Sequence, residues 1–354
     1  MKKNICLFID TFGAGGAERV CINYANELVK MNFDVTILVF NLNKQFYISE
    51  LDDAVKIESL DALTGTRAFS IIIKKKEILD KFDLFIAFNH QIALILFVLK
   101  FLLKINKPLI ARNVNNLKMD LAAKKGSFIK RNITKFLMRN LYSKMTAYIA
   151  QCNAMKESMI ESYSIPKEKI EVIYNPVSTT FKKINLKKDI DILFVGRLTQ
   201  QKGIDNFIKI ITKIYKELPN LHLYIVGQGD LKDDLISSLE ELGVHYTHDL
   251  QSGDLVNLYN RAKVTVLTSY YEGYPNVLVE SIACGTPVVS FDCKSGPSEI
   301  IKHGVNGFLI TNFDVCLFSK QVVNMLNDGY SIDAINNNKN EPRKLKRVLD
   351  SLTV

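Results

Sequence analysis

The sequence predicts an α/β protein built from two doubly wound, Rossmann-like domains with a cleft between them. Three observations support this fold class. Short apolar runs of strand length alternate with helical patterns, the alternation starts again near the middle of the chain, and glycine-bearing turns follow several of the runs. Alternating strands and helices favour a parallel sheet with helices on both faces. A chain of 354 residues is long enough for two such cores.

The expected division follows composition. We expect an N-terminal domain over residues 1–180, a second domain over 181–335, and a loop and helix over 336–354. The lysine-rich segment 182–188 predicts an exposed connection at the boundary, and the Asn/Lys-rich residues 336–340 predict a loop before a helix at 341–352.

The chain begins with an apolar run at residues 4–9, a turn containing Gly15 and Gly16, and a helical pattern. This order is typical of a phosphate-binding loop. A dinucleotide fingerprint would need a third glycine where Glu18 stands, so an NAD-dependent oxidoreductase is disfavoured. A close strand–helix turn without a ligand remains an equal alternative for this loop alone.

Three polar residues follow later strands of the first half. His90 follows the strand at 84–88, and Arg112 and Asn113 follow a strand that starts at Pro108. Ligands bind at the carboxyl ends of strands in α/β folds, so these residues are candidates for a ligand-binding site. A purely structural role is the alternative for His90.

The net positive charge lies entirely in the N-terminal half. Residues 1–180 hold 26 Lys/Arg and 17 Asp/Glu, which accounts for the whole net charge of +9. Residues 118–144 combine eight basic residues with apolar residues at helical spacing. Such a helix can lie on an anionic membrane surface, although packing of its apolar face on the core is an equal alternative. Nucleic acid is not expected as a partner, because no binding motif accompanies these charges.

Location is inferred from three features. The apolar run at 92–103 is shorter than the roughly 20 residues of a membrane span, and the apolar start ends too early, at Asp10, for a signal peptide. The six cysteines form no CxxC pair, so neither disulfides nor a zinc site is expected. We therefore expect a cytoplasmic protein, with peripheral contact to the inner face of the cell membrane through 118–144.

The most informative stretch runs from Glu272 to Glu280. Pro275 suits a first helical position, so the N–H groups of Asn276 and Val277 would lie at a helix start, where a phosphate is favoured. Glu272 would precede the helix and Glu280 would lie about two turns inside it. Two carboxylates around an anion site suit a sugar nucleotide, whereas a solvated helix face is the alternative.

Four turns of the second half fall at strand ends, at 196–203, 227–230, 249–253 and 272–275. Such ends converge on one edge of a doubly wound sheet. Arg197 and Lys202, on the first turn, could clamp a diphosphate through a planar fork and a point charge.

Several motifs occur in a specific order along residues 4–310. The second half contains Gly-Arg-Leu-x-x-x-Lys-Gly, Val-Gly-x-Gly, Glu-x7-Glu and Ala-x-Gly-Thr-Pro-Val-Val, and the first half contains Gly-Gly-Ala-Glu-Arg-Val, Ile-Ala-Arg-Asn and Val-Ile-Tyr-Asn-Pro-Val. Together they resemble the GT-B fold retaining glycosyltransferases of the group 1, GT4-like family. The resemblance implies a GT-B architecture, with the C-terminal helix crossing back to the first domain.

The resemblance also implies roles for single residues. Arg197 and Lys202 would bind the donor diphosphate and stabilise the leaving nucleotide in place of a metal, so no cofactor is expected. With Glu272 near the reacting carbon, they form the expected catalytic set. The expected donor-binding set is Gly15, Gly16, Arg197, Lys202, Gly227, Leu250, Glu272, Asn276, Val277 and Glu280.

One position departs from the family pattern. Several relatives carry a His where Asn113 stands, and an Asn cannot act as a general base. Without a side-chain base, the leaving phosphate would take the acceptor proton.

The predicted activity is transfer of a sugar, hexosyl or N-acetylhexosaminyl, from a nucleotide donor that we expect to be UDP-linked. The expected acceptor is a glycan or a polyprenyl-diphosphate-linked glycan in surface polysaccharide synthesis. A GT-B nucleotide-sugar epimerase and a non-catalytic nucleotide-sugar-binding module are the alternatives. A phosphorylase of this fold would need a pyridoxal lysine, for which no signature is present.

Overall fold

The computed structural model describes residues 2–13, 15–114, 128–250, 254–335 and 341–352. The chain forms two compact units, one of Met1–Pro176 with Asn338–Val354 and one of Val177–Asn337. The division falls after Pro176, and the described helix at 341–352 belongs with the first unit.

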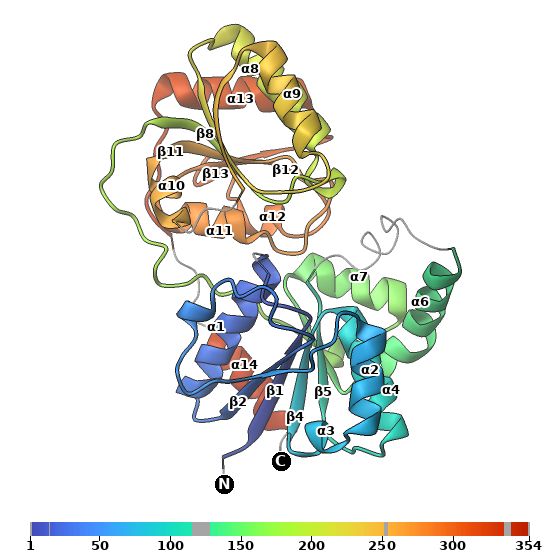
Figure 1. Ribbon diagram of the computed structural model, residues 1–354. Coiled ribbons are helices and arrows are strands. Elements are labelled where there is room, and N and C mark those ends of the chain that lie inside the picture. The colour runs from blue at the N-terminus through green and yellow to red at the C-terminus, as the bar shows by residue number, and fades with distance from the viewer. Residues whose placement is uncertain (1, 14, 115–127, 251–253, 336–340, 353–354) are drawn as a thin grey trace. The chain divides into compact units, whose positions relative to one another are not determined.

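The N-terminal unit is built on a parallel sheet. Within the described residues the sheet has seven strands in the order β3-β2-β1-β4-β5-β6-β7 (Figure 1). Leu7 of β1 lies beside Ile37 of β2 and Ile86 of β4, so the strand order reverses beside β1 and the unit is doubly wound. The strands are β1 Asn4–Ile9, β2 Asp34–Val39, β3 Lys56–Ser59, β4 Leu84–Phe88, β5 Leu109–Arg112, β6 Ala147–Ala150 and β7 Ile170–Val172.

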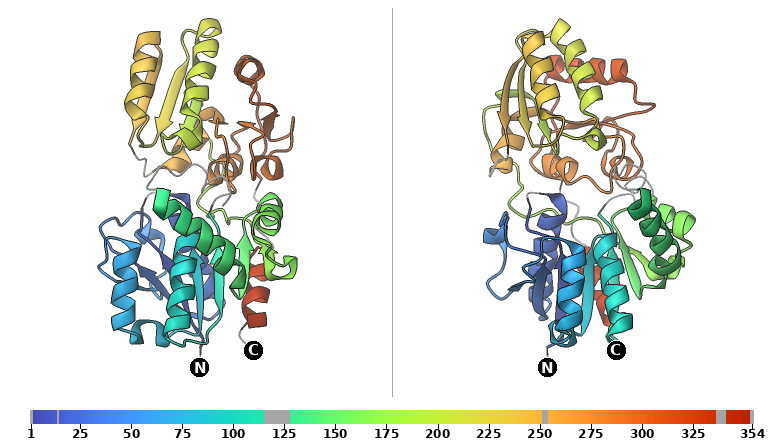
Figure 2. Two further views of the ribbon diagram at one scale, coloured as in Figure 1. Left: turned by 90° about the vertical axis from the view of Figure 1, so that its right-hand side faces the viewer. Right: turned by 45° about the vertical axis from the view of Figure 1, so that its right-hand side comes forward.

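Helices connect these strands and cover the sheet, as Figure 2 shows from two further directions. The α-helices are α1 Gly16–Lys30, α2 Gly65–Lys74, α3 Glu77–Asp80, α4 His90–Leu102, α6 Phe128–Leu141, α7 Asn153–Tyr163 and α14 Glu341–Leu352. The short 3-10 helices are η1 Ile48–Glu50, η2 Tyr142–Lys144 and η3 Lys167–Lys169.

The last helix, α14, packs on the N-terminal unit although it is last in sequence (Figure 1). Leu345 and Leu349 are buried in the same core as β1 and α1. At the start of the helix, Glu341 Oε2 accepts a hydrogen bond from the backbone N–H of Tyr174 at 2.8 Å, and Lys344 Nζ contacts Glu341 Oε1 at 3.1 Å. The helix is therefore held by apolar burial and by a buried carboxylate.

The C-terminal unit repeats the design. Its described residues form a six-stranded parallel sheet in the order β10-β9-β8-β11-β12-β13. The order reverses beside β8, so the switch point lies between β8 and β11, where a doubly wound sheet binds its ligand. The strands are β8 Ile190–Val195, β9 His222–Val226, β10 His245–Asp249, β11 Ala262–Leu267, β12 Val288–Phe291 and β13 Gly307–Ile310.

Two cores lie on the two faces of this second sheet. Phe194 of β8 packs in a core with residues of α8, α9 and α13. Its neighbour Leu193 packs in the other core, with residues of α10, α11 and α12. Adjacent strand residues point to opposite faces, which explains the nearly continuous apolar sequence of β8. The helices are η4 Gln200–Lys202, α8 Ile204–Glu217, α9 Lys232–Leu242, α10 Leu255–Arg261, α11 Asn276–Ala283, α12 Pro297–Ile300 and α13 Val315–Asp328.

Candidate active site

The two loops that follow β8 and β11 are packed directly against each other. Thr268 Oγ1 donates a hydrogen bond to the carbonyl oxygen of Lys202 at 2.8 Å. Gly203 lies in the left-handed region at φ +64°, and a Cβ at this position would come within 2.1 Å of the Thr268 carbonyl oxygen. Only glycine fits here without strain, so the loop that carries Lys202 is fixed beside the loop that carries Glu272.

The centre of the candidate site is the contact between Lys202 and Glu272. Lys202 Nζ lies 2.6 Å from Glu272 Oε1, and both side chains are largely buried, at 14% and 6% exposure. Ser269 Oγ donates to the same oxygen at 2.6 Å. The pair also affects the neighbouring Cys293 thiol, whose pKa is raised by burial and by Glu272 and is lowered in part by Lys202.

Arg197 lies on the same loop as Lys202 but is exposed. Its Nη2 donates to Gln201 Oε1 at 2.8 Å, and no carboxylate of the described residues lies within ion-pair distance of it. Gln201 Nε2 donates in turn to the carbonyl oxygen of Tyr271 at 3.1 Å. Gln201 therefore joins the Arg197 guanidinium to the segment that leads into Glu272, and leaves the guanidinium charge open to an anion.

The turn after β9 packs on the turn after β8. Gly227 has φ +153°, and a Cβ there would lie 1.8 Å from the carbonyl oxygen of Gly196. Leu250, which directly follows β10, is 53% exposed, so its apolar side chain forms part of the surface at the carboxyl end of the sheet. The rest of the predicted turn, residues 251–253, lies outside the described residues.

The helix start after Glu272 differs from the sequence prediction. Pro275 is the residue before the helix, with ψ 107°, and α11 begins at Asn276. Asn276 and Val277 are therefore the first two helical residues, where backbone N–H groups have no intrahelical acceptor. Glu280 is the fifth helical residue, a little over one turn from the start rather than two. It is 6% exposed and accepts a hydrogen bond from the Tyr259 hydroxyl at 3.0 Å.

In the N-terminal unit, the glycine turn makes room for a carboxylate. A Cβ at Gly15 would lie 2.4 Å from Glu18 Oε2, and a Cβ at Gly13 would lie 3.1 Å from Glu18 Oε1. Gly15 precedes α1, and Gly16 is its exposed first residue. The position that would hold the third glycine of a dinucleotide fingerprint thus carries a negative side chain folded over the turn, which opposes a pyrophosphate there.

The polar residues after β4 and β5 are buried. His90 is the first residue of α4 and is 5% exposed. Arg112 is fully buried, donates from Nη2 to Asn175 Oδ1 at 2.5 Å, and lies over the rings of Tyr24 and Phe88. Arg112 therefore ties the end of β5 to the segment that leaves the unit at Pro176.

Asn113 is also fully buried. Its Oδ1 accepts from the Tyr142 hydroxyl, its Nδ2 contacts Met159 Sδ at 3.3 Å, and its carbonyl oxygen accepts from Gln151 Nε2 at 2.7 Å. An acceptor could touch Asn113 only after rearrangement of this network, so Asn113 is here part of the core.

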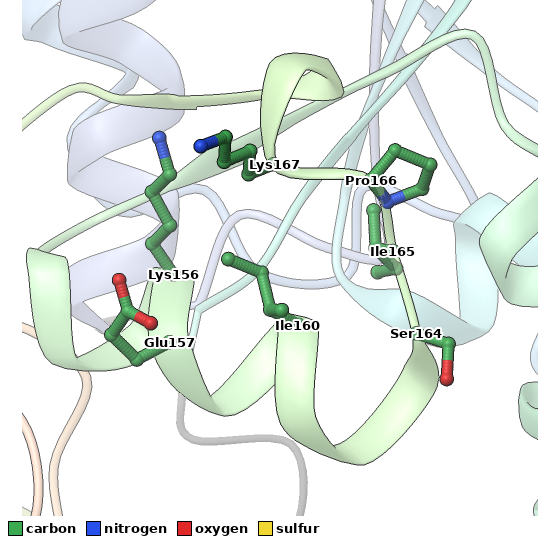
Figure 3. Close-up of a pocket in the computed structure, with 7 residues that line it drawn as sticks. All are labelled: Lys156, Glu157, Ile160, Ser164, Ile165, Pro166 and Lys167. Carbon is green, nitrogen blue, oxygen red and sulfur yellow. The ribbon is translucent and has the colours of Figure 1, made fainter.

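Two other observations concern the described residues. A surface hollow beside α7 is lined by residues 156, 157, 160 and 164–167 (Figure 3). It contains none of the predicted site residues. Among the described residues no group of three or more His, Cys, Asp or Glu side chains is placed to hold a metal ion.

Two family models together match residues 14–341 of the chain. The family model "Glycosyltransferase Family 4" matches residues 14–181, and the model "Glycosyl transferases group 1" matches residues 177–341. An uncharacterized glycosyltransferase of Haemophilus influenzae is 29% identical over 315 residues, 87% of this chain and 86% of the relative. A Campylobacter jejuni enzyme, the GalNAc-α-(1→4)-GalNAc-α-(1→3)-diNAcBac-PP-undecaprenol α-1,4-N-acetyl-D-galactosaminyltransferase, is 28% identical over 95% of this chain and 92% of its own length.

Solved structures agree on the fold. S. aureus TarM, in a complex that includes UDP, superposes with a TM-score of 0.75 at 14% identity, covering 98% of each chain. Anabaena HepE in complex with UDP gives a TM-score of 0.72 at 18% identity, covering 99% of this chain and 100% of that one. Two doubly wound parallel sheets of this kind define a GT-B protein, and the fold prediction is confirmed.

The chain belongs to the group 1, GT4-like family of glycosyltransferases. The family resemblance inferred from the ordered motifs is therefore confirmed, as is the prediction that the protein is a glycosyltransferase.

Three residues beside the predicted set were missed by the sequence analysis, namely Gln201, Ser269 and Tyr259. Ser269 lies three positions before Glu272 on the same loop, but this spacing alone does not predict a contact between the two side chains. Gln201 lies between Arg197 and Lys202 on a polar turn. Tyr259 had no signal, since its contact with Glu280 depends on the packing of α10 and α11.

Proposed function

We propose that this glycosyltransferase transfers a hexosyl or N-acetylhexosaminyl group from a UDP-sugar to a glycan or polyprenyl-diphosphate-linked glycan, with retention of configuration, in surface polysaccharide synthesis. The Lys202–Glu272 contact of 2.6 Å carries this proposal, because it places a cation and a carboxylate together at the switch point of the second sheet. The Campylobacter relative, which is named as acting on an undecaprenyl-diphosphate-linked glycan, supports the acceptor class.

In this proposal the donor diphosphate is held by charge and by backbone. Lys202 and the exposed Arg197 would neutralise the phosphates, and the N–H groups of Asn276 and Val277 would donate to them. Fixed cations of this kind stabilise the charge that develops on a leaving nucleotide, which is the role of a metal in other transferases. We therefore propose metal-independent transfer, with Glu280 accepting from the ribose hydroxyls and Gly227 and Leu250 lining the nucleotide.

Glu272 would contact the sugar. Its Oε1 is occupied by Lys202 and Ser269, whereas no hydrogen bond to Oε2 is made by the described residues. Oε2 is thus placed to accept from a sugar hydroxyl near the reacting carbon. In this proposal no side chain forms a covalent intermediate, and the acceptor would attack on the face from which UDP leaves. The leaving phosphate oxygen would take the acceptor proton.

The N-terminal unit would supply the acceptor side. Gly15 and Gly16 would let the loop before α1 approach the donor and the acceptor. His90 and Arg112 would act near the acceptor from beneath the surface, with Asn113 holding the end of β5. These assignments rest on position at the carboxyl ends of strands β1, β4 and β5.

We also propose peripheral binding to an anionic membrane through the segment 118–144. In its described part, helix α6, Ile133 and Phe136 are 53% and 66% exposed, and Arg139 is exposed as well. Residues 118–127 lie outside the described residues. No helix in the described part of the chain is long and apolar enough to cross a membrane. Exposed apolar residues beside cations suit an interface with anionic lipid.

The experiment is a transfer assay with a panel of labelled UDP-sugars and polyprenyl-diphosphate-linked oligosaccharides. Lys202→Ala and Glu272→Ala are expected to lower turnover at least about 100-fold, the effect of losing one transition-state donor in other enzymes. Arg261→Ala, which removes an exposed ion pair with Asp189 near the start of β8, is the matched control and should leave transfer unchanged. Wild-type turnover in both site variants would overturn the assignment, and NMR of the product would reveal whether the anomeric configuration is retained.

A further inference from the structure

Ser269 has no place in the predicted site, yet its hydroxyl is directed at the centre of it. The residue is 1% exposed and lies in the loop between β11 and α11. Its Oγ donates to Glu272 Oε1 at 2.6 Å, a distance typical of a strong charge-assisted hydrogen bond. The same oxygen accepts from Lys202 Nζ at 2.6 Å, so one carboxylate oxygen has two donors.

The hydrogen bonds of Lys202 and Ser269 to Glu272 differ in whether they can persist when a nucleotide sugar binds. Lys202 is on a different loop, 70 positions away in sequence, and carries a charge that a diphosphate would attract. When Lys202 turns to the phosphates, Glu272 loses its cation while it remains nearly buried at 5% exposure. A buried carboxylate without a partner is costly and moves toward any available donor. Ser269 is uncharged and lies on the same loop as Glu272, so its hydrogen bond to the carboxylate can persist while the diphosphate is bound.

We propose that Ser269 is a positioning residue for the transfer reaction, which keeps Glu272 oriented toward the sugar when Lys202 exchanges the carboxylate for the donor diphosphate. The backbone supports this arrangement from the other side, because the N–H of Glu272 donates to the carbonyl oxygen of Lys294 at 3.1 Å. The loop that carries Ser269 is itself fixed by the hydrogen bond from Thr268 Oγ1 to the Lys202 carbonyl. This inference rests on the proposed function of Glu272 as the sugar ligand.

The test compares Ser269→Ala with Ser269→Thr, which keeps the hydroxyl. Ser269→Ala should lower kcat about 10- to 100-fold, the size expected for one hydrogen bond to a charged group, with donor KM changed less than about threefold. UDP lacks the transferred sugar that Glu272 would contact, so UDP should raise the melting temperature of Ser269→Ala as much as that of the wild type. Ser269→Thr should restore most of the turnover. Ser319→Ala, which removes a buried hydroxyl bonded within α13, is the control and should have wild-type kcat.

Three results would overturn the inference. The first is wild-type kcat in Ser269→Ala. The second is an equal loss of UDP stabilisation and of turnover, which would indicate a general structural role. The third is a Ser269→Thr variant with the melting temperature of the wild type but a kcat no higher than that of Ser269→Ala. If instead the wild-type protein neither binds UDP nor transfers sugar from any UDP donor, the proposed function itself fails, and that outcome is separate from these three.

Discussion

Replacing Gly203 with alanine is expected to damage both stability and transfer, because this glycine sits where the two site loops touch. Its φ of +64° alone costs an L-residue about 1–2 kcal/mol. The new Cβ would lie 2.1 Å from the Thr268 carbonyl oxygen, where contacts below 3.0 Å are essentially never seen. Relief of this overlap requires backbone movement, and overpacking of that kind costs about 1–3 kcal/mol.

The two contributions sum to about 2–5 kcal/mol, which corresponds to a fall in melting temperature of roughly 5–15 °C for a unit of this size. The forced shift is passed to Ser269, which directly follows Thr268, and to Glu272 three residues further along the loop. A displacement of about 1 Å at a reacting centre can cost about 100-fold in rate, so kcat should fall by that order. Thermal unfolding followed by circular dichroism and the transfer assay measure the two effects.

Gly329→Ala is the matched control. Gly329 ends α13 at φ +65°, and no atom lies within 4 Å of its added Cβ. The Gly329→Ala variant should lose only the stability that a positive φ costs an L-residue, about 1–2 kcal/mol, and should keep the wild-type rate of transfer. If Gly203→Ala were as mild as Gly329→Ala in melting temperature and in kcat, the close packing of the two loops would be refuted.

Three further outcomes are expected. Tyr259→Phe removes the hydroxyl that donates to Glu280 at 3.0 Å, so donor KM should rise about tenfold with kcat little changed; an unaltered KM would remove Glu280 from the donor site. Glu341→Ala leaves the Tyr174 N–H without its acceptor and should lower the free energy of unfolding by about 1–3 kcal/mol in urea titrations, and an unchanged midpoint would contradict the anchoring of α14. Transfer should continue at the wild-type rate after exhaustive treatment with a chelator, whereas activity restored only by added Mg²⁺ or Mn²⁺ would disprove metal independence.

The fold was predictable because its signals are local. Apolar runs and glycine turns identify the strands and the loops after them, and the parallel topology then brings the loop ends together. Lys202 and Glu272 were expected to converge for this reason, and the structure places them 2.6 Å apart.

What the sequence could not predict depends on packing between segments. The burial of Arg112 and Asn113 follows from contacts with Asn175 and Tyr142, which lie 63 and 29 positions away. The start of α11 at Asn276 was missed because Pro275 fits either side of a helix boundary, and only its ψ of 107° decides the matter. The hydrogen bond between Tyr259 and Glu280 depends on how α10 packs on α11, and the periodicity of one sequence does not predict that packing.

The most direct measurement is the melting temperature of the protein with and without saturating UDP, in the wild type, Lys202→Ala and Lys263→Ala. Lys202 and Lys263 make ion pairs of 2.6 and 2.7 Å in the same unit, but Lys263 lies near the start of β11, away from the candidate site. UDP at 100 times its Kd should add about 2.7 kcal/mol of stability, several degrees, to the wild type and to Lys263→Ala, and far less to Lys202→Ala. Equal stabilisation of all three proteins, or of none, would contradict the assignment of this site to the nucleotide-sugar donor.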